Sequence, residues 1–419
     1  MTELAFDRGR IRSLFDLRSD VYASRGGTFD ADPNPTFRRL RETGPVHAGI
    51  PHESLGWTGE VFFQGLPYPD RPHFSAYDYE TCATVLQDDE CFVTSQPPRA
   101  GEPPLADAAI LFMDGKRHRS YRKLVQPSFV PGRAVWWLEN WIRDTVHRLI
   151  DTFEADGTAD LNVDFCAPIP LLTITGSFGI TIAEALDVRA AVTSDGKDGV
   201  TLARLLVPIV AARREEPRDD LISVLVQAEV TDGDGVLHRL TDEEVLSFAF
   251  LLLAAGSGTT WKQMGIALLA LLSHPEALAA VREDRTFLRV VVEESLRWTP
   301  TDPVFARFVA QDCELGGVGL PAGAIVHACL AAANRDPARW DHPDEFDPFR
   351  PIKPHLGFGY GPHICLGAHV ARMEMTYGIG ALLDRLPALR LDPGAPEPRV
   401  IGLYERGPDA VPVRFGGGS

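Results

Sequence analysis

Cysteine is scarce in this chain, with six residues among 419, and no two of them have Cys-x-x-Cys spacing. Such scattered cysteines do not form the dense disulfide framework of a small secreted domain, and the missing spacing gives a structural zinc site little support. Lysine and arginine are too few to balance the acidic residues, because 41 against 58 leave a formal net charge of −17. General nucleic-acid binding is therefore not expected, since an acidic chain supplies phosphate contacts only from a local basic patch.

The N-terminal twenty residues contain neither the apolar region of a signal peptide nor a run that could span a membrane. We therefore expect a cytoplasmic, monomeric protein without a membrane partner. Internal repeats and long linkers are missing too, and 45% hydrophobic with 24% charged residues is ordinary for a globular protein. The sequence predicts one domain over residues 1–419, with an irregular region and insertion at 1–70 and a flexible tail at 416–419.

Helical patterns dominate the chain. Thr241 and Glu244 have the spacing of a capping box, and the pattern that they open runs to about Leu272. A second helix is expected at 287–298, before a Thr-Pro pair that stops it. Strand patterns are short and lie at 46–49, 74–77, 324–329 and 411–415. The expected fold class is mainly α with small β regions.

A Gly-rich loop at 355–367 carries Cys365 and precedes a helical pattern that begins near Ala368. Backbone N–H groups at a helix N-terminus favour a thiolate over a thiol, and glycine lets the backbone approach a flat ligand closely. We therefore expect this loop to hold Cys365 as an anion.

Other interpretations of the glycine-containing segments fit less well. The loop glycines alternate, whereas a dinucleotide fingerprint needs two residues between its second and third glycine. Ser257 lacks the flanking glycines of a nucleophile elbow. A nucleophilic Cys365 with a histidine base stays conceivable, but His363 is only two residues away. A plain core thiol would leave the glycines without a role.

The loop resembles the haem-binding loop of cytochromes P450 at every fixed position, which are Phe358, Gly361, His363, Cys365 and Gly367. The resemblance implies a single-domain cytochrome P450 fold around a buried haem b. It also implies that Cys365 is the thiolate ligand of the iron, which favours O–O cleavage. Phe358, Gly359, His363 and Gly367 would then contact the cofactor.

Further cofactor contacts follow from the same resemblance. His118 and Arg122 lie four residues apart and match the family segment that binds a haem propionate. Arg307 matches the second propionate arginine. Charged donors suit this role, because a haem in an apolar core needs its carboxylates neutralised.

Glu294 and Arg297 resemble the Glu-x-x-Arg pair of the family, which Arg350 would complete. Taken alone, a Glu and an Arg at this spacing are a common surface pair worth roughly a few tenths of a kcal/mol. Since the haem loop follows in the order of the family, a structural triad is the better interpretation.

The segment 254–260 resembles the oxygen-binding groove of the family, so that Ala255 would contact the haem and Ser257, Gly258 and Thr259 would serve catalysis. Glycine and threonine are poor helix formers, which predicts a local distortion of the long helix. Close helix packing is the alternative reason for the two glycines. One position departs from the family, because Gly258 stands where most members carry an acid.

The stretch between 179 and 213 is shorter than expected for the two lid helices of the family, so we expect a small, mobile lid. The insertion-like stretch 51–69, which is rich in aromatic residues, would cover part of what the lid leaves open. We also expect the loop 94–112 and a further set of residues to line the substrate site, namely Leu252, Ala255, Val304 and Phe305.

The resemblance implies a monooxygenase that inserts one oxygen atom of O2 into a small or medium apolar substrate. Electrons from NAD(P)H would arrive through a separate ferredoxin and ferredoxin reductase. A local basic cluster suits such an acidic partner, and it comprises Lys116, Arg117, Arg119 and Lys123. Two alternatives stay open: a P450 that couples radicals, dehydrates or rearranges its substrate, and a redox-inactive P450-like binding domain.

Overall fold

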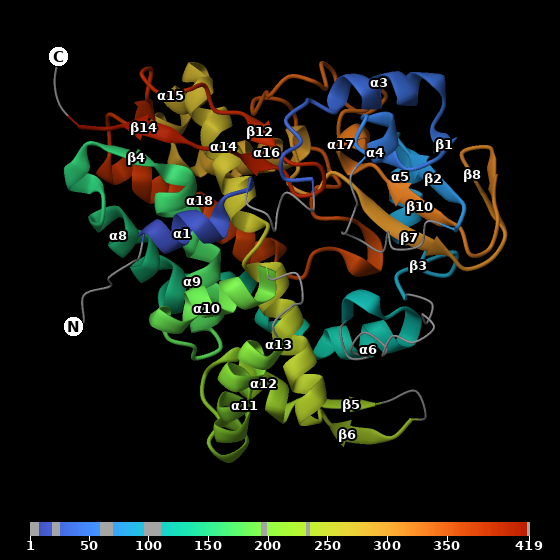
Figure 1. The fold of residues 1–419 in the computed structure, drawn as a ribbon, viewed down its shortest axis with the longest axis horizontal. Coiled ribbons are helices and arrows are strands. Elements are labelled where there is room, and N and C mark those ends of the chain that lie inside the picture. Colours follow the sequence, from blue (N-terminus) through green and yellow to red (C-terminus); the bar gives the residue numbers. More distant parts are fainter. Residues whose placement is uncertain are drawn as a thin grey trace.

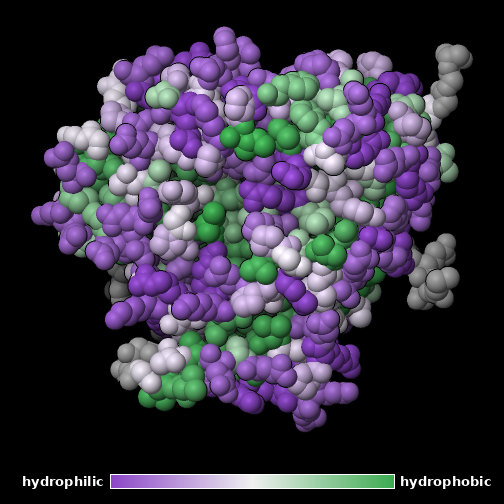
Figure 2. Space-filling view, turned by 180° about the vertical axis from the view of Figure 1, so that it is seen from behind, coloured by the Kyte–Doolittle hydropathy of each residue, from purple (hydrophilic) through white to green (hydrophobic). Residues whose placement is uncertain are grey.

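The computed structural model describes residues 8–18, 26–58, 70–95, 110–193, 199–231 and 235–416. Helices fill the larger part of the molecule, and most strands gather at one side of it (Figure 1). The predicted fold class, mainly α with small β regions, is confirmed. Seen from behind the view of Figure 1, the surface is largely hydrophilic, with hydrophobic side chains showing in a hollow near its centre (Figure 2).

The long helix is confirmed in its extent but is broken in the middle. It consists of α13 (Asp242–Gly256) and α14 (Thr260–Ser273). The capping box opens it, because Thr241 Oγ1 accepts the Glu244 N–H at 3.2 Å and Glu244 Oε2 accepts the Thr241 N–H at 2.8 Å. The break lies between Gly256 and Thr260, where glycine and threonine have low helix propensity. The local distortion predicted from the sequence is therefore confirmed.

These two helices form the centre of the helical part. α13 packs against α9 (Pro168–Gly176), α11 (Gly199–Glu215) and α12 (Leu221–Gln227), whereas α14 packs against α16 (Leu288–Trp298) and α18 (Ala368–Arg385). In the described part of the chain, 242–273 is the one helical stretch long and apolar enough to cross a membrane. Every α14 residue from 261 to 268 is buried, as in the core helix of a globular protein.

A five-stranded sheet forms the core of the other side. Its strands follow the order β1 (Val46–Ala48), β2 (His73–Ala76), β10 (Ile325–Ala328), β7 (Phe305–Val309) and β3 (Phe92–Val93). Only β2 and β10 run parallel; the other neighbours are antiparallel. The strands predicted near 46, 74 and 324 are confirmed. In this sheet Arg307 on β7 pairs with Val326 on β10. Strand β3 ends at Val93, directly before Thr94.

The remaining elements are shorter or peripheral. The helices are α1 (Arg8–Phe15), α3 (Asn34–Thr43), α4 (Pro51–Ser54), α5 (Tyr79–Gln87), α6 (Gly115–Val125), α7 (Pro131–Trp137), α8 (Arg143–Asp151), α10 (Ile182–Thr193), α15 (Pro275–Glu283) and α17 (Leu330–Ala333), with short turns η1 (Ile110–Phe112), η2 (Gln126–Ser128), η3 (Leu138–Ile142), η4 (Glu154–Asp156), η5 (Asn162–Cys166), η6 (Arg285–Phe287) and η7 (Gly361–His363). The strands are β4 (Thr158–Asp160), β5 (Glu229–Thr231), β6 (Leu237–Arg239), β8 (Cys313–Leu315), β9 (Val318–Leu320), β11 (Arg390–Leu391), β12 (Val400–Ile401), β13 (Gly407–Pro408) and β14 (Pro412–Arg414). The strand predicted at 411–415 is therefore confirmed as β14.

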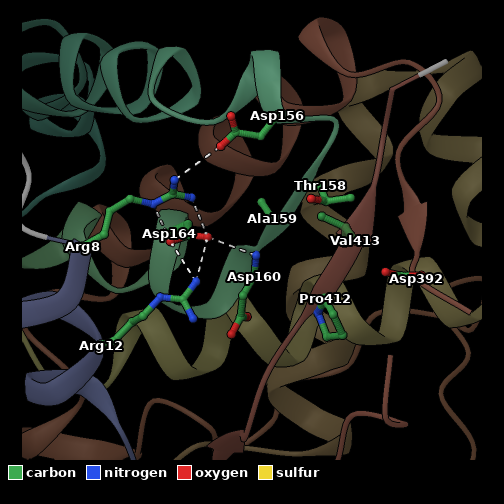
Figure 3. Close-up of a pocket in the computed structure, with 10 residues that line it drawn as sticks. All are labelled: Arg8, Arg12, Asp156, Thr158, Ala159, Asp160, Asp164, Asp392, Pro412 and Val413. Carbon is green, nitrogen blue, oxygen red and sulfur yellow. Dashed lines mark hydrogen bonds and ion pairs between the residues drawn. The ribbon is translucent and has the colours of Figure 1, made fainter. Parts of the chain in front are cut away.

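The expectation of an irregular region at 1–70 was wrong for much of its described part, which contains α1, α3, α4 and β1. Two arginines anchor α1, because Arg8 and Arg12 approach the carboxylate of the buried Asp164 at 3.0 and 3.3 Å. Their side chains line a pocket of about 630 Å³ between α1, β4, η5 and β14 (Figure 3). None of the residues proposed from the sequence for the active site lines this pocket.

Helix α1 packs against α10, which belongs to the stretch expected to form a small, mobile lid; that expectation stays a prediction. Phe15 at the end of α1 meets the Trp261 ring edge-on at 5.4 Å, and the Arg189 guanidinium of α10 lies 4.4 Å from the Phe15 ring. Phe15 of the N-terminal helix therefore contacts both α10 and α14. Residues 194–198, which join α10 to α11, and 59–69 of the insertion-like stretch lie outside the described residues.

Candidate active site

The loop that carries Cys365 is a tight turn in front of α18. The Cys365 N–H donates to the Phe358 carbonyl at 2.8 Å, and the Gly359 N–H donates to the Leu356 carbonyl at 2.8 Å. Gly359 and Gly361 have φ angles of +73° and +71°, which favour glycine. A Cβ at Gly361 would also come within 2.6 Å of a backbone oxygen of α5. The alternating glycines are therefore needed to present an accessible Cys365 before a helix.

The expectation that this loop by itself holds Cys365 as an anion was wrong. Although Cys365 keeps an accessible surface, loss of solvation by the atoms packed around its sulfur raises the pKa of the thiol above its usual value, and the Gly367 N–H, Arg122 and Arg372 act in the opposite direction. The N–H at the helix start has the predicted sign but is outweighed by the loss of solvation. A bound metal cation removes the thiol proton outright, so the thiolate state depends on coordination.

His118 of α6 lies beside the loop. Its ring is 1% exposed and stacks on the His363 ring, with centroids 3.9 Å apart. Neither ring nitrogen of His118 has a hydrogen-bond partner among the described residues. Burial, together with the nearby His363 and Arg122, lowers the pKa of His118 to about 3, so the ring is neutral and keeps one N–H donor. A buried donor without a partner is costly unless a ligand binds it.

Two arginines bring positive charge to the same region. Arg307 on β7 is 8% exposed, and its NH1 donates to the Ala306 carbonyl at 2.9 Å. Burial lowers the pKa of Arg307 to about 10, which leaves the guanidinium charged at neutral pH. Arg122 donates from NH2 to the Ile364 carbonyl at 2.7 Å and so ties α6 to the residue before Cys365.

A carboxylate completes this region. Asp114 accepts the N–H groups of Thr94 and Ser95 at 2.9 and 2.7 Å, and His363 Nε2 lies 3.7 Å from Asp114 Oδ1. Burial opposes ionisation, but these hydrogen bonds hold the pKa of Asp114 well below its usual value. Asp114 thereby fixes the edge of His363, and the N–H of His118 and the Arg307 guanidinium can bind another anion.

The side chains fit the haem that the sequence resemblance implies. A haem needs a thiolate ligand for its iron and charged or polar donors for two propionates in an otherwise apolar site. Cys365 offers the thiol, while His118 and Arg307 offer a partnerless imidazole donor and a charged guanidinium in the described structure. Arg122 is tied to Ile364 and supports the loop as much as it offers charge.

The break between α13 and α14 holds the residues that the resemblance assigns to oxygen binding and catalysis. Ala254 and Ala255 are exposed although α13 runs through the middle of the molecule, and Thr259 is partly exposed. Ser257 is fully buried, and its Oγ forms no hydrogen bond within the described chain. A Cβ at Gly258 would lie 4.0 Å from Arg189 NH1, so a side chain there would face a buried guanidinium.

The proposed substrate-lining residues differ in exposure. Ala255 is exposed and Phe305 is partly exposed, as a lining role requires. Leu252 and Val304 are 8% and 3% exposed and pack within hydrophobic clusters, which argues against direct contact with a substrate. Of the proposed loop 94–112, residues 96–109 lie outside the described part of the structure.

Sequence reasoning missed a group of buried charges on this side of α14. Lys262 is fully buried and forms an ion pair with Glu405, whose side chain is 14% exposed. Asp302 lies within electrostatic reach of both, and burial, reinforced by Glu405, raises the pKa of Asp302 to about 7. A lysine in an otherwise apolar helix was the available signal, but its partner is 143 residues away.

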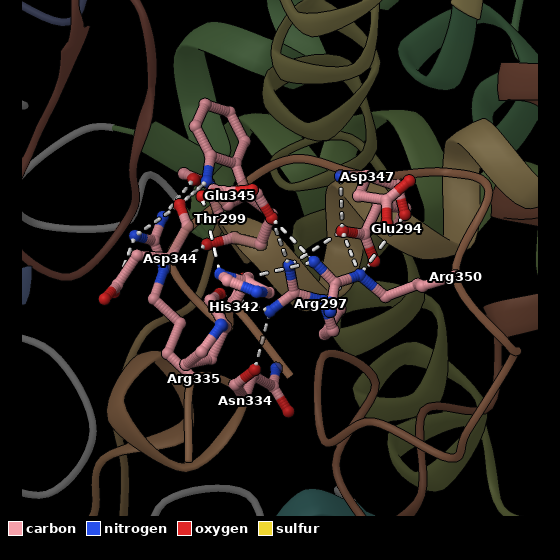
Figure 4. A network of polar contacts seen from close by, with 12 residues as sticks. Glu294, Arg297, Thr299, Asn334, Arg335, His342, Asp344, Glu345, Asp347 and Arg350 are labelled. Carbon is pink, nitrogen blue, oxygen red and sulfur yellow. Dashed lines mark hydrogen bonds and ion pairs between the residues drawn. The ribbon is translucent and has the colours of Figure 1, made fainter. Parts of the chain in front are cut away.

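The predicted triad of Glu294, Arg297 and Arg350 forms in the structure and supports the segment before the Cys365 loop. Glu294 Oε1 accepts from Arg297 NH2 at 2.7 Å and from Arg350 Nε at 3.0 Å, and Oε2 accepts from Arg297 Nε at 2.8 Å (Figure 4). Arg297 also donates to the carbonyls of Asn334, Pro343 and Glu345. The triad therefore joins α16 to the segment that leads into the Cys365 loop.

Comparisons with known proteins agree with this arrangement. A family model described as Cytochrome P450 matches residues 201–400. The cytochrome P450 monooxygenase PikC of Streptomyces venezuelae is 34% identical over 93% of this chain and 92% of its own length. The biotin biosynthesis cytochrome P450 of Bacillus subtilis is 30% identical over 87% of this chain and 91% of its own. A solved myxobacterial cytochrome P450, CYP267B1, in complex with myristic acid has a TM-score of 0.79 at 29% identity, covering 97% of this chain and 100% of that one. The chain therefore belongs to the cytochrome P450 family and is of the bacterial type.

Proposed function

We propose that this cytochrome P450 monooxygenase inserts one oxygen atom of O2 into a small or medium, mainly apolar organic substrate in specialised metabolism. The observation that carries the proposal is the accessible Cys365 thiol, presented by a turn that only glycine can form, beside a buried imidazole without a protein partner. A hydroxylation, an epoxidation or an O-dealkylation would each follow from such a transfer.

The residues of this chain have separate tasks in the proposed reaction. Haem b, bound through Cys365, supplies the activation of O2 and the transfer of an oxygen atom. His118, Arg307 and His363 would bind the carboxylates of the cofactor and fix its orientation, while Phe358, Gly359 and Gly367 would contact it next to Cys365. Ala255 and its neighbour Ala254 leave room on the opposite side because their side chains are small. Thr259 holds a proton at its hydroxyl, close to where Ser257 and Gly258 open the helix.

Electrons come from separate redox proteins in this proposal, namely a ferredoxin and its ferredoxin reductase, which draw on NAD(P)H. The basic cluster of α6 supports a docking surface for an acidic ferredoxin, since Lys116, Arg117, Arg119 and Lys123 are all exposed. Arg122 on the same helix donates to the carbonyl of the residue before Cys365, which supports docking of the partner beside Cys365. We also propose that the protein acts in the cytoplasm as a monomer.

An apolar substrate is supported by the accessible side chains of the site and by relatives. CYP267B1 was solved with myristic acid, and P450BioI, with a TM-score of 0.78 at 28% identity, was solved with acyl carrier protein ligated to hexadec-9Z-enoic acid. Ala254, Ala255 and Phe305 offer apolar contacts in this chain. The further P450 alternative, radical coupling, dehydration or rearrangement, is favoured by the absence of an acid at Gly258. A redox-inactive binding domain would not need the Cys365 and His118 arrangement.

The haem-thiolate part of the proposal is tested with Cys365→Ala. The wild-type protein should give the thiolate signature in its reduced, carbon-monoxide-bound absorption spectrum, and the variant should lose it because no other side chain supplies that ligand. Cys313→Ala is the matched control and should keep the signature. Monooxygenation itself is tested by screening substrates for a spectral shift and then searching the product for oxygen from labelled O2. NAD(P)H-dependent turnover that gives an unlabelled, rearranged product would favour the alternative P450 chemistry.

A further inference from the structure

Most cytochromes P450 carry an acid at the position of Gly258. In this chain the segment 254–260 contains the hydroxyl groups of Ser257, Thr259 and Thr260 but no carboxyl group. Two protons must nevertheless reach dioxygen as it is reduced, and a buried site has to supply them through positioned groups. A carboxylic acid from another element would serve this purpose if it lay close to the first turn of α14.

Asp302 belongs to the loop that follows α16, and hydrogen bonds hold this loop against the first turn of α14. The Thr301 N–H donates to Gln263 Oε1 at 2.9 Å, and the Gln263 N–H donates to the Thr259 carbonyl at 3.1 Å. From the other side, the Arg406 N–H donates to the Thr301 carbonyl at 2.7 Å. The Gln263 side chain thus fixes the residue before Asp302 to the first turn of α14, in which the Gln263 backbone bonds to Thr259. The Arg406 guanidinium itself binds the carbonyls of the 400–402 strand end and does not neutralise the aspartate.

The charged groups that act on Asp302 come from two other elements. Lys262 on α14 and Glu405 before β13 form an ion pair within electrostatic reach of it, and Glu405 also acts on the buried Arg189 of α10. The Asp302 charge also acts on the Cys365 thiol and raises its pKa. Asp302 Oδ1 is buried and accepts no hydrogen bond from the described residues.

We propose that Asp302 is the carboxylic acid of the proton relay and replaces the acid that position 258 lacks. In the overall reaction, O2, the substrate, two electrons from ferredoxin and two protons give the oxygenated product and one water. Asp302 gives up a proton toward the reduced oxygen through Thr259 or an ordered water. It regains a proton from solvent by way of Glu405, whose side chain is partly exposed beside Lys262.

The titration of Asp302 suits this task. Burial raises its pKa to about 7, with the Glu405 charge acting in the same direction and Lys262 opposing it. An acid whose pKa lies near the working pH combines a large protonated fraction with ready proton release. An ordinary exposed aspartate, with a pKa near 3.9, would be almost fully ionised and would donate poorly.

The first experiment does not depend on turnover. Infrared difference spectra of the ferric protein should show a protonated carboxyl band that Asp302→Asn removes and that disappears in the wild type as the pH rises through about 7. Glu374 is a second buried acid, with a pKa raised to about 8, so Glu374→Gln serves to assign its separate band. A wild-type Asp302 that is ionised throughout would overturn the proposal.

The second experiment measures peroxide released per NAD(P)H consumed, together with substrate affinity from the spectral shift. Asp302→Asn should raise peroxide release severalfold with little change in the dissociation constant, and Gly258→Asp in the same background should lower it again. The exposed Asp284→Asn is the matched control. Weaker substrate binding with unchanged coupling would mean that Asp302 anchors the substrate, and the relay role would be refuted.

This inference rests on the proposed monooxygenase function, but the two fail differently. If the wild type makes no oxygenated product with any substrate that shifts its spectrum, the proposed function fails. If the wild type makes such a product and Asp302→Asn couples equally well, only the role of Asp302 is lost.

Discussion

Replacing Glu294 by Gln removes one negative charge from the centre of the network in Figure 4 while keeping the shape of the side chain. Its carboxylate accepts two hydrogen bonds from Arg297 and one from Arg350, and its side chain is 4% exposed. Arg297 is 2% exposed, so the variant leaves a buried guanidinium without its counter-charge. Breaking such a buried pair costs about 3–5 kcal/mol, and a glutamine oxygen recovers only part of the hydrogen bonding.

The assay is urea unfolding of the haem-loaded protein, followed by tryptophan fluorescence and by far-ultraviolet circular dichroism. The exposed pair of Glu139 and Arg143 on neighbouring turns is the matched control, and Glu139→Gln should change the free energy of unfolding by less than about 0.5 kcal/mol. If unfolding is irreversible, unfolding rates at one urea concentration give the same comparison. A Glu294→Gln protein within about 1 kcal/mol of the wild type would refute the view that this charge is required.

The remaining predictions concern the haem site. His118→Ala with Arg122→Ala should speed haem loss to a haem-binding acceptor protein at least about tenfold, since one charge-assisted hydrogen bond is worth roughly 1.5–3 kcal/mol; unchanged haem retention would count against the propionate role. Thr259→Ala should raise peroxide release per NAD(P)H severalfold with a well-bound substrate, and equal coupling would remove its hydroxyl from the relay. Asp302 has a raised folded-state pKa of about 7 against 3.8 when unfolded, so its contribution to stability is lost as the pH rises between these values. Asp302→Asn should therefore match the wild type in urea at about pH 4 and exceed its stability at about pH 8, and a constant difference would contradict the shift.

Sequence reasoning correctly predicted the parts of the fold that depend on residues close together in the chain. The capping box at Thr241 and Glu244 and the Thr-Pro stop after Trp298 marked helix ends because caps act within one turn. The break at Gly258 followed from helix propensity in the same way. The Cys365 loop was recognisable because its backbone conformation requires glycine at fixed positions.

The parts that sequence reasoning missed depend on contacts between distant segments. Nothing near Arg8 predicts that it would meet Asp164, and nothing near Lys262 identifies Glu405 as its counter-charge. The Cys365 error has the same origin, because a helix N-terminus acts locally whereas desolvation depends on everything packed around the thiol. Val304 likewise sits at a plausible lining position but is buried by neighbours that the sequence cannot place.

The packing of α1 has a practical consequence for anyone who expresses or redesigns this enzyme. Phe15 lies between the Trp261 ring, two residues after Thr259, and the Arg189 guanidinium. Trimming the chain to start at α3 would expose the Trp261 ring and the buried Arg189, whose NH1 would lie 4.0 Å from a Cβ at Gly258. A purification tag is therefore better fused after residue 416, and libraries aimed at new substrates gain by including α1 among the positions to vary.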